Sequence, residues 1–133
     1  CGPMLYDVDL SVSLAPNDKD ATTIARTNFD QMYYSSAQQL AHHSTSGCPM
    51  NVGDLLGSGT ISGPTKSERG SLLELSWGGK EPLTLDTGDE RSFLLDGDTL
   101  TLSGHAQGDG YRIGFGSCVG SVLSATNTGE GQT

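Results

Sequence analysis

An alternation of apolar and polar side chains near the start of the chain constrains the fold more than any other feature of the sequence. The apolar positions are Tyr6, Val8, Leu10, Val12 and Leu14, and the polar positions between them are Asp7, Asp9, Ser11 and Ser13. Successive side chains of a β-strand point to opposite sides. The pattern therefore predicts an antiparallel strand with one side on the core and the other in water.

The period of the sequence changes after a predicted turn at 15–20 and a predicted second strand at 21–26. Apolar residues then recur at helical spacing, at Phe29, Met32, Tyr33, Ala37 and Leu40. Asn28 and Gln31 fit a capping box, and Gly47 fits the residue after a helix end. We therefore expect one main helix over about residues 28–44.

The rest of the sequence predicts strands and loops. Expected strands cover about 53–56, the run GSLLELSWGG at 70–79, a hairpin at 82–85 and 91–95, and segments at 99–103 and 111–123. Residues 124–133 form a polar tail. The predicted fold class is α+β, with one helix against mostly antiparallel strands.

Composition excludes several kinds of partner. The formal net charge is −9 and no basic run occurs, so nucleic acid and anionic membranes are poor partners. No apolar stretch approaches the roughly 20 residues of a membrane span. The three cysteines, Cys1, Cys48 and Cys118, are odd in number and lack metal-site spacing, which favours a reducing, cytoplasmic setting.

The chain also has features expected of a piece of a longer polypeptide. Hydrophobic residues make up only 34%, and there are 19 glycines. The chain opens CGPMLYDVDL, without an initiator Met or a signal peptide, and enters a strand pattern at once.

Glu74 is the most informative polar residue, because it stands within an apolar run. If 70–79 is a strand with one wet side, Glu74 is simply solvated, and the pattern alone favours this interpretation. If both sides are covered, the carboxylate needs a partner.

Other candidate sites are weaker. The loop GSGTISGP could bring backbone N–H groups and the Thr60 hydroxyl to a ligand, although an ordinary glycine-rich crossover fits equally well. His42 and His43 are adjacent, so they suit a helix C-terminus better than one metal ion. Tyr111, Arg112 and Phe115 lie in QGDGYRIGFG, which lacks the features of a P-loop, and they could pack or line a site.

Several long stretches together resemble the C-terminal part of the fumarylacetoacetase family. They are YDVDLSVSL, HHSTSGCPMNVGDLLGSGTISGP, GSLLELSWGG and FLLDGDTLTLSGHAQGDGYRIGFGSCVG. The resemblance runs in register over about residues 5–123, so we expect 1–123 to be the C-terminal part of such a catalytic domain. It implies a mixed β-sandwich roll within a larger domain.

The resemblance also implies an activity. The family hydrolyses a carbon–carbon bond of 4-fumarylacetoacetate, a small diketo acid, to fumarate and acetoacetate, in tyrosine and phenylalanine breakdown. Its members are homodimers that use Mg²⁺ or Ca²⁺. Glu74 matches the glutamate that orients a water-activating histidine, and Thr60 matches a threonine that contacts the substrate.

The family's other catalytic groups have no counterpart here. Its metal-binding carboxylates, its water-activating histidine and its leaving-group Lys, Arg and Gln all precede the matching stretch, and His42 and His43 match its helix-end histidines instead. We therefore expect this chain to hold no metal and to be inactive alone. A stand-alone binding or scaffold module is the alternative, and a related acylpyruvate hydrolase or decarboxylase is a third possibility.

Overall fold

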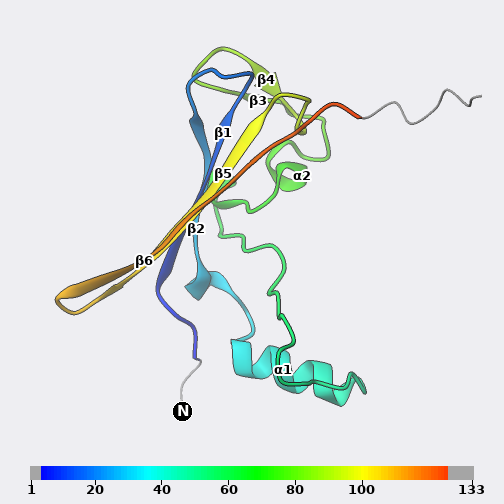
Figure 1. The fold of residues 1–133 in the computed structure, drawn as a ribbon, viewed down its shortest axis with the longest axis vertical. Helices are drawn as coiled ribbons and strands as arrows, with labels where there is room; N and C mark the ends of the chain where they lie inside the picture. Colours follow the sequence, from blue (N-terminus) through cyan, green and yellow to red (C-terminus); the bar gives the residue numbers. More distant parts are fainter. Residues whose placement is uncertain (1–3, 126–133) are drawn as a thin grey trace, which may run out of the picture.

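The computed structural model describes residues 4–125, and its main feature is a four-stranded antiparallel sheet in the order β2-β1-β5-β6 (Figure 1). The strand bounds are Val8–Ala15 (β1), Thr22–Asn28 (β2), Thr99–Gly108 (β5) and Tyr111–Ser121 (β6). The predicted strands at 6–14, 21–26 and 111–123 are confirmed with shifts of one or two residues at their ends, and the strand predicted at 99–103 is confirmed but extends to Gly108. β1 thus pairs both with its hairpin neighbour and with a strand more than 80 residues later.

The predicted hairpin at 82–85 and 91–95 is confirmed in part, as the short strands β3 (Leu83–Thr84) and β4 (Glu90–Arg91), but residues 92–95 form no strand. They form a second, two-stranded sheet. The described part of the chain is therefore α+β, as expected.

The main helix is shorter than predicted. Asn28 caps only a 3₁₀ turn, η1 (Phe29–Gln31), and α1 (Ser36–Thr45) begins after a break. The full capping box belongs to Ser35 and Gln38, whose side chains each accept from the other's backbone N–H. The helix was predicted too long because both Asn28–Gln31 and Ser35–Gln38 fit the capping pattern.

The C-terminal end of α1 matches its prediction. Gly47 has a φ of 81°, and its N–H and that of Cys48 donate to the carbonyls of Ser44 and His43. These two bonds form a Schellman motif, which needs a left-handed residue at the glycine position. No residue of α1 is buried, and in Figure 1 the helix lies apart from the sheet.

Two strand predictions were wrong. Residues 53–56 form no strand, and the run at 70–79 contains a four-residue helix, α2 (Leu72–Leu75), instead. Ser71 caps α2 by accepting from the N–H of Glu74. A serine that satisfies a free N–H favours a helical turn over a strand at this position.

The core of the described residues is small. Its buried hydrophobic side chains are Leu14, Ala25, Leu75 and Leu85. Residues of α2 and of β1, β2 and β5 line a shared apolar hollow that includes Val12, Leu72 and Leu100. The helix therefore packs on the apolar side of the sheet, at one end of it.

A buried ion pair joins the small sheet to the start of β5. Arg91 Nε and Nη2 each lie 2.9 Å from a carboxylate oxygen of Asp98, which also accepts from the N–H of Leu95. Asp98 is fully buried and Arg91 is 8% exposed. Each carboxylate oxygen has a partner, as a buried charge requires.

Within residues 4–125, no helix has the length and the apolar composition needed to cross a bilayer.

Candidate active-site edge

Glu74 lies in the single turn of α2, and the fold holds that turn firmly. Leu75, the next residue, is buried, while Glu74 itself is half-buried. In the predicted strand, the side chains of Glu74 and Leu75 would have pointed to opposite faces. The helical turn instead places Glu74 at the edge of the core, where its carboxylate contacts another part of the chain.

That contact is with Ser62. The Ser62 hydroxyl lies 2.6 Å from Glu74 Oε2, to which it donates, and its oxygen accepts from the N–H of Gly70 at 3.1 Å. Because one hydroxyl serves both groups, it fixes the glycine-rich loop against the segment that leads into α2. Among the described residues, no hydrogen bond to Glu74 Oε1 is recorded, so this oxygen is free to accept from another group.

Thr60 lies in the same place. A side-chain carbon at Gly70 would meet the carbonyl oxygen of Ile61 and come within 2.9 Å of Thr60 Cγ2. Only a glycine permits this approach. The structure therefore brings the loop with Thr60 against the segment with Glu74, and Thr60 itself is exposed.

Arg69 and Trp77 complete the arrangement. Arg69 Nη1 donates to the carbonyl of Glu74 at 2.9 Å, and its guanidinium lies 5.5 Å from the centroid of the Trp77 ring. Trp77 has a φ of 49°, in the left-handed region, which costs a non-glycine residue roughly 1–2 kcal/mol. Sequence reasoning missed Ser62, Arg69 and Trp77, and for Trp77 the only signal was its place before two glycines.

The histidines of the described residues lie elsewhere. His42 and His43 are exposed in the last turn of α1, where the helix dipole favours them, as predicted. The hydrogen-bond partner of the Glu74 side chain is Ser62 rather than a histidine. A histidine paired with Glu74 stays a prediction.

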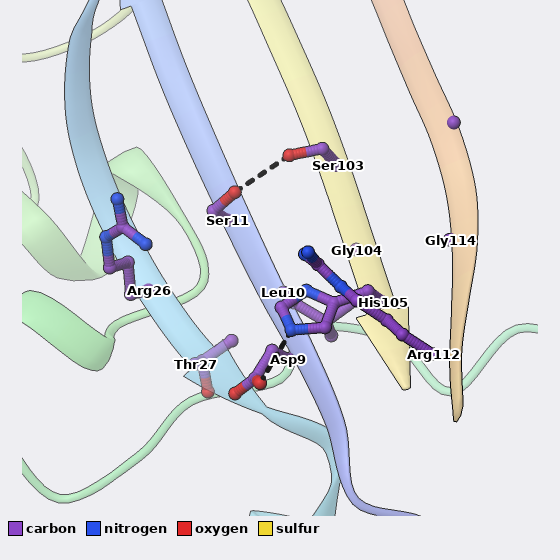
Figure 2. A pocket seen from close by; sticks show the side chains of 11 residues that line it. Asp9, Leu10, Ser11, Arg26, Thr27, Ser103, Gly104, His105, Arg112 and Gly114 are labelled. Atoms are coloured by element: carbon purple, nitrogen blue, oxygen red, sulfur yellow. Dashed lines mark hydrogen bonds and ion pairs between the residues drawn. The ribbon is translucent and has the colours of Figure 1, made fainter. Parts of the chain in front are cut away.

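A second hollow, larger than the apolar hollow beneath α2, lies on the polar side of the sheet (Figure 2). Its volume is about 530 Å³, and its lining includes Asp9, Ser11, Arg26, Ser103, His105 and Arg112. Figure 2 shows Asp9 and His105 pointing toward each other, and His105 Nε2 lies 3.1 Å from a carboxylate oxygen of Asp9. α2 packs on the other side of the sheet, so this hollow is separate from Glu74 and Thr60.

The three candidate residues within QGDGYRIGFG, which are Tyr111, Arg112 and Phe115, have different surroundings. Arg112 lines the polar hollow, Tyr111 is 61% exposed, and Phe115 lies on the apolar side near Leu10.

The described residues do not fit a metal centre. Nowhere within 4–125 do three His, Cys, Asp or Glu side chains come together as the ligands of one ion would. Asp7 and Asp9 both accept from the Asn28 amide.

Comparison with known proteins assigns the chain to a family. The family model described as fumarylacetoacetate (FAA) hydrolase C-terminal matches residues 3–123, which include both Thr60 and Glu74. The chain belongs to the fumarylacetoacetate hydrolase family.

Curated fumarylacetoacetases agree with this assignment. The chain is 53% identical to fumarylacetoacetase from Homo sapiens over 124 residues, 92% of this chain and 30% of that protein. It is 49% identical to the Dictyostelium discoideum enzyme over 93% of this chain and 30% of that protein. The Arabidopsis thaliana enzyme is 49% identical, over 89% and 28%. The chain therefore spans about 30% of the length of these fumarylacetoacetases.

Proposed function

We propose that this chain supplies one edge of the active site of a fumarylacetoacetase, which hydrolyses the carbon–carbon bond of 4-fumarylacetoacetate. The observation that supports this most directly is the Ser62 hydroxyl, which ties the loop of Thr60 to the carboxylate of Glu74. Both residues lie in the region that matches the family. The proposal extends to the family's fold, a mixed β-sandwich roll, of which the described sheet would be a part.

In this proposal Glu74 is a positioning residue. Oε2 is held by Ser62, and Oε1 is the oxygen that would accept from a histidine of the remaining polypeptide. The carboxylate would fix the tautomer of that imidazole and stabilise its cationic form as water attacks the carbonyl. Thr60, exposed on the adjoining loop, would donate to the substrate.

The other groups of the reaction would come from the rest of the enzyme. A Mg²⁺ or Ca²⁺ ion, when bound there, would polarise the diketone and stabilise the negative charge on the leaving group. The chain alone would hold no such ion and would not hydrolyse the substrate. We further propose a cytoplasmic homodimer for the complete enzyme, and contact with neither nucleic acid nor membrane.

A chimera tests the function. The matched third of the human enzyme would be replaced by residues 3–123 of this chain, and hydrolysis of 4-fumarylacetoacetate would be measured with Mg²⁺ or Ca²⁺. Glu74→Gln should lower kcat on the order of 100-fold or more, with a smaller change in KM. The control Glu81→Gln changes an exposed carboxylate paired with Lys66 and should leave kcat unchanged.

Three outcomes contradict the proposal. An active chimera in which Glu74→Gln does not slow turnover would remove the role of Glu74. Metal-dependent hydrolysis by the 133-residue chain alone would show that its own acidic residues complete the site. A chimera that folds with bound metal but never turns over would favour the alternative, a binding or scaffold module.

A further inference from the structure

The edge strand β6 has none of its eleven residues buried. It is the last strand of the order β2-β1-β5-β6, so alternate N–H and C=O groups on its outer edge have no partner in the described sheet. Proteins normally blunt such an edge with charges, proline or a covering segment. β6 has one charged residue, Arg112, no proline, and a single bulge opposite Gly104.

The apolar side of the sheet is also uncovered beside this edge. Leu102, Ile113 and Phe115 are 45%, 52% and 60% exposed. A side-chain carbon at Gly104 would lie within 3.2 Å of both Leu10 and Phe115, so the glycine lets Phe115 lean across β5 toward Leu10. Together these side chains form a continuous apolar surface next to the unpaired edge.

α2 covers only the opposite end of this side. The hollow beneath it is lined by Val12, Leu75 and Leu100 and reaches Leu102, but it does not include Ile113 or Phe115. Leu102 therefore lies where the covered end of this side meets the uncovered end. In Figure 1 the β5–β6 hairpin projects at the lower left, clear of α1 and α2.

The total surface indicates the size of the missing cover. The chain exposes 9488 Å², whereas a compact protein of 13.9 kDa exposes about 6,700 Å². Residues 1–3 and 126–133, outside the described range, could account for at most about 1,700 Å² of this excess, the surface of eleven fully extended residues. About 1,000 Å² of the excess therefore belongs to residues 4–125. The residues that the structure describes therefore expose at least as much surplus surface as one side of a standard protein interface, about 800 Å².

The distribution of that surface points to the kind of partner. Exposed large apolar side chains occur also in turns and loops outside the sheet, among them Val52, Leu55, Trp77 and Phe93. A second copy of the chain, joined through one twofold patch, would leave most of them bare. The relatives are about three times longer than the match, so a fumarylacetoacetase has 70% of its length available to surround it.

We propose that the β6 edge, with Leu102, Ile113 and Phe115, is the surface on which the remaining polypeptide of a fumarylacetoacetase docks, by adding a strand to β6 and apolar side chains to its side. This inference rests on the proposed function, since it takes the rest of that enzyme as the partner. Strand addition satisfies the free backbone groups of an edge, and the apolar side chains add the hydrophobic contribution.

Amide hydrogen exchange tests the inference. Exchange would be measured in β6 of the 133-residue chain at low concentration and in β6 of the chimera with the human enzyme. β6 amides should exchange at least 10-fold more slowly in the chimera. Phe115→Lys in the chimera should reverse most of that protection, whereas the matched control Val52→Lys, at a fully exposed loop position, should not.

The outcomes separate this inference from the proposed function. Equal β6 exchange in the two proteins would overturn the docking surface, even if the chimera hydrolyses its substrate. Protection already present in the 133-residue chain, with the mass of a dimer, would show a second copy as the partner and overturn it too. Protected β6 in a chimera whose Glu74→Gln variant stays fully active would support the docking surface and remove the catalytic assignment.

Discussion

At the scale of single residues, the Ser62 hydroxyl matters because it is shared. It donates to Glu74 and accepts from the N–H of Gly70, so its loss would free the carboxylate and leave a backbone donor unpaired. A hydrogen bond to a charged group contributes about 1.5–3 kcal/mol. The orientation of the Glu74 carboxylate therefore depends on the Ser62 hydroxyl.

Replacing Ser62 with Ala in the chimera should lower kcat roughly 10-fold to 100-fold and change KM less, because only the orientation of Glu74 is lost. Ser62→Thr keeps the hydroxyl and should restore most of the rate. Steady-state kinetics of both variants decide the matter. Equal losses of kcat in Ser62→Ala and Ser62→Thr would mean that the Ser62 side chain contributes only to packing and not through its hydroxyl.

The buried pair of Arg91 and Asp98 is the strongest electrostatic feature of the described residues. Removing one partner leaves a buried charge without compensation, so Asp98→Ala should lower the free energy of unfolding by about 3–5 kcal/mol. Asp96→Ala, two residues away and exposed, should change it by less than about 0.5 kcal/mol. Urea denaturation of the 133-residue chain measures both, and similar values for the two variants would contradict the assignment.

The same pair predicts how stability depends on pH. Hydrogen bonds from Arg91 hold the pKa of Asp98 below its ordinary value of 3.8, while burial opposes them and the Leu95 N–H assists. A lowered folded pKa contributes stability that is present above the unfolded pKa and is lost as pH falls through the folded value. Unfolding measured from pH 7 to pH 2.5 should show a decline beginning near pH 4.

Asp98→Ala should make that decline shallower. Glu68, Glu81 and Asp89 also have lowered pKa values, from hydrogen bonds with Thr65, Lys66 and Lys19. They titrate in both chains, so the difference between the two pH profiles reports on Asp98. If the free energy of unfolding declined equally steeply at low pH in both chains, the contribution of Asp98 to the pH dependence would be refuted.

At the scale of elements, α1 depends on its ends. None of its residues is buried, so tertiary packing contributes little and the caps matter more than usual. Its N-terminal capping box and its C-terminal Schellman motif each satisfy backbone groups that would otherwise be unpaired.

Ser35→Ala should therefore destabilise α1 by about 1 kcal/mol and leave the sheet unchanged. Ser36→Ala, at the first helical residue, makes no capping bond and is the control. Exchange of the α1 amides should speed up about fivefold in Ser35→Ala alone. An equal change in exchange rate in both variants would show that the Ser35 cap does not stabilise α1.

The elements also show how far the sequence can predict this fold. Strands with clear alternation were predicted correctly, because packing of one side against a core imposes the period. The wrong predictions came from short segments: LLEL fits both a strand and one helical turn, and Ser71 decides between them. The residue pattern singled out Glu74 and Thr60, and family resemblance supplied their expected roles. The Ser62–Glu74 contact joins residues 12 apart, and no local pattern encodes it.

At the scale of the whole molecule, the small core predicts an unusual unfolding transition. The slope of unfolding free energy against urea, the m-value, is proportional to the surface that unfolding exposes. Because the folded chain already exposes so much, its m-value should be clearly below that of a compact 133-residue domain. Equilibrium denaturation at low concentration, with the mass checked by light scattering, measures it, and a full-sized m-value for a monomer would contradict the exposed surface.

The pairing of β1 with β5 has a consequence for the order of folding. β5 and β6 meet across a tight turn, and Gly108 pairs with Tyr111, whereas Ala15 pairs with Thr99 across 84 residues. Closing the longer loop costs about 3 kcal/mol more chain entropy. The β5–β6 hairpin should form early, and the slow step should be the arrival of β1, so substitutions along β1 should slow folding, whereas substitutions in α1 should only speed unfolding.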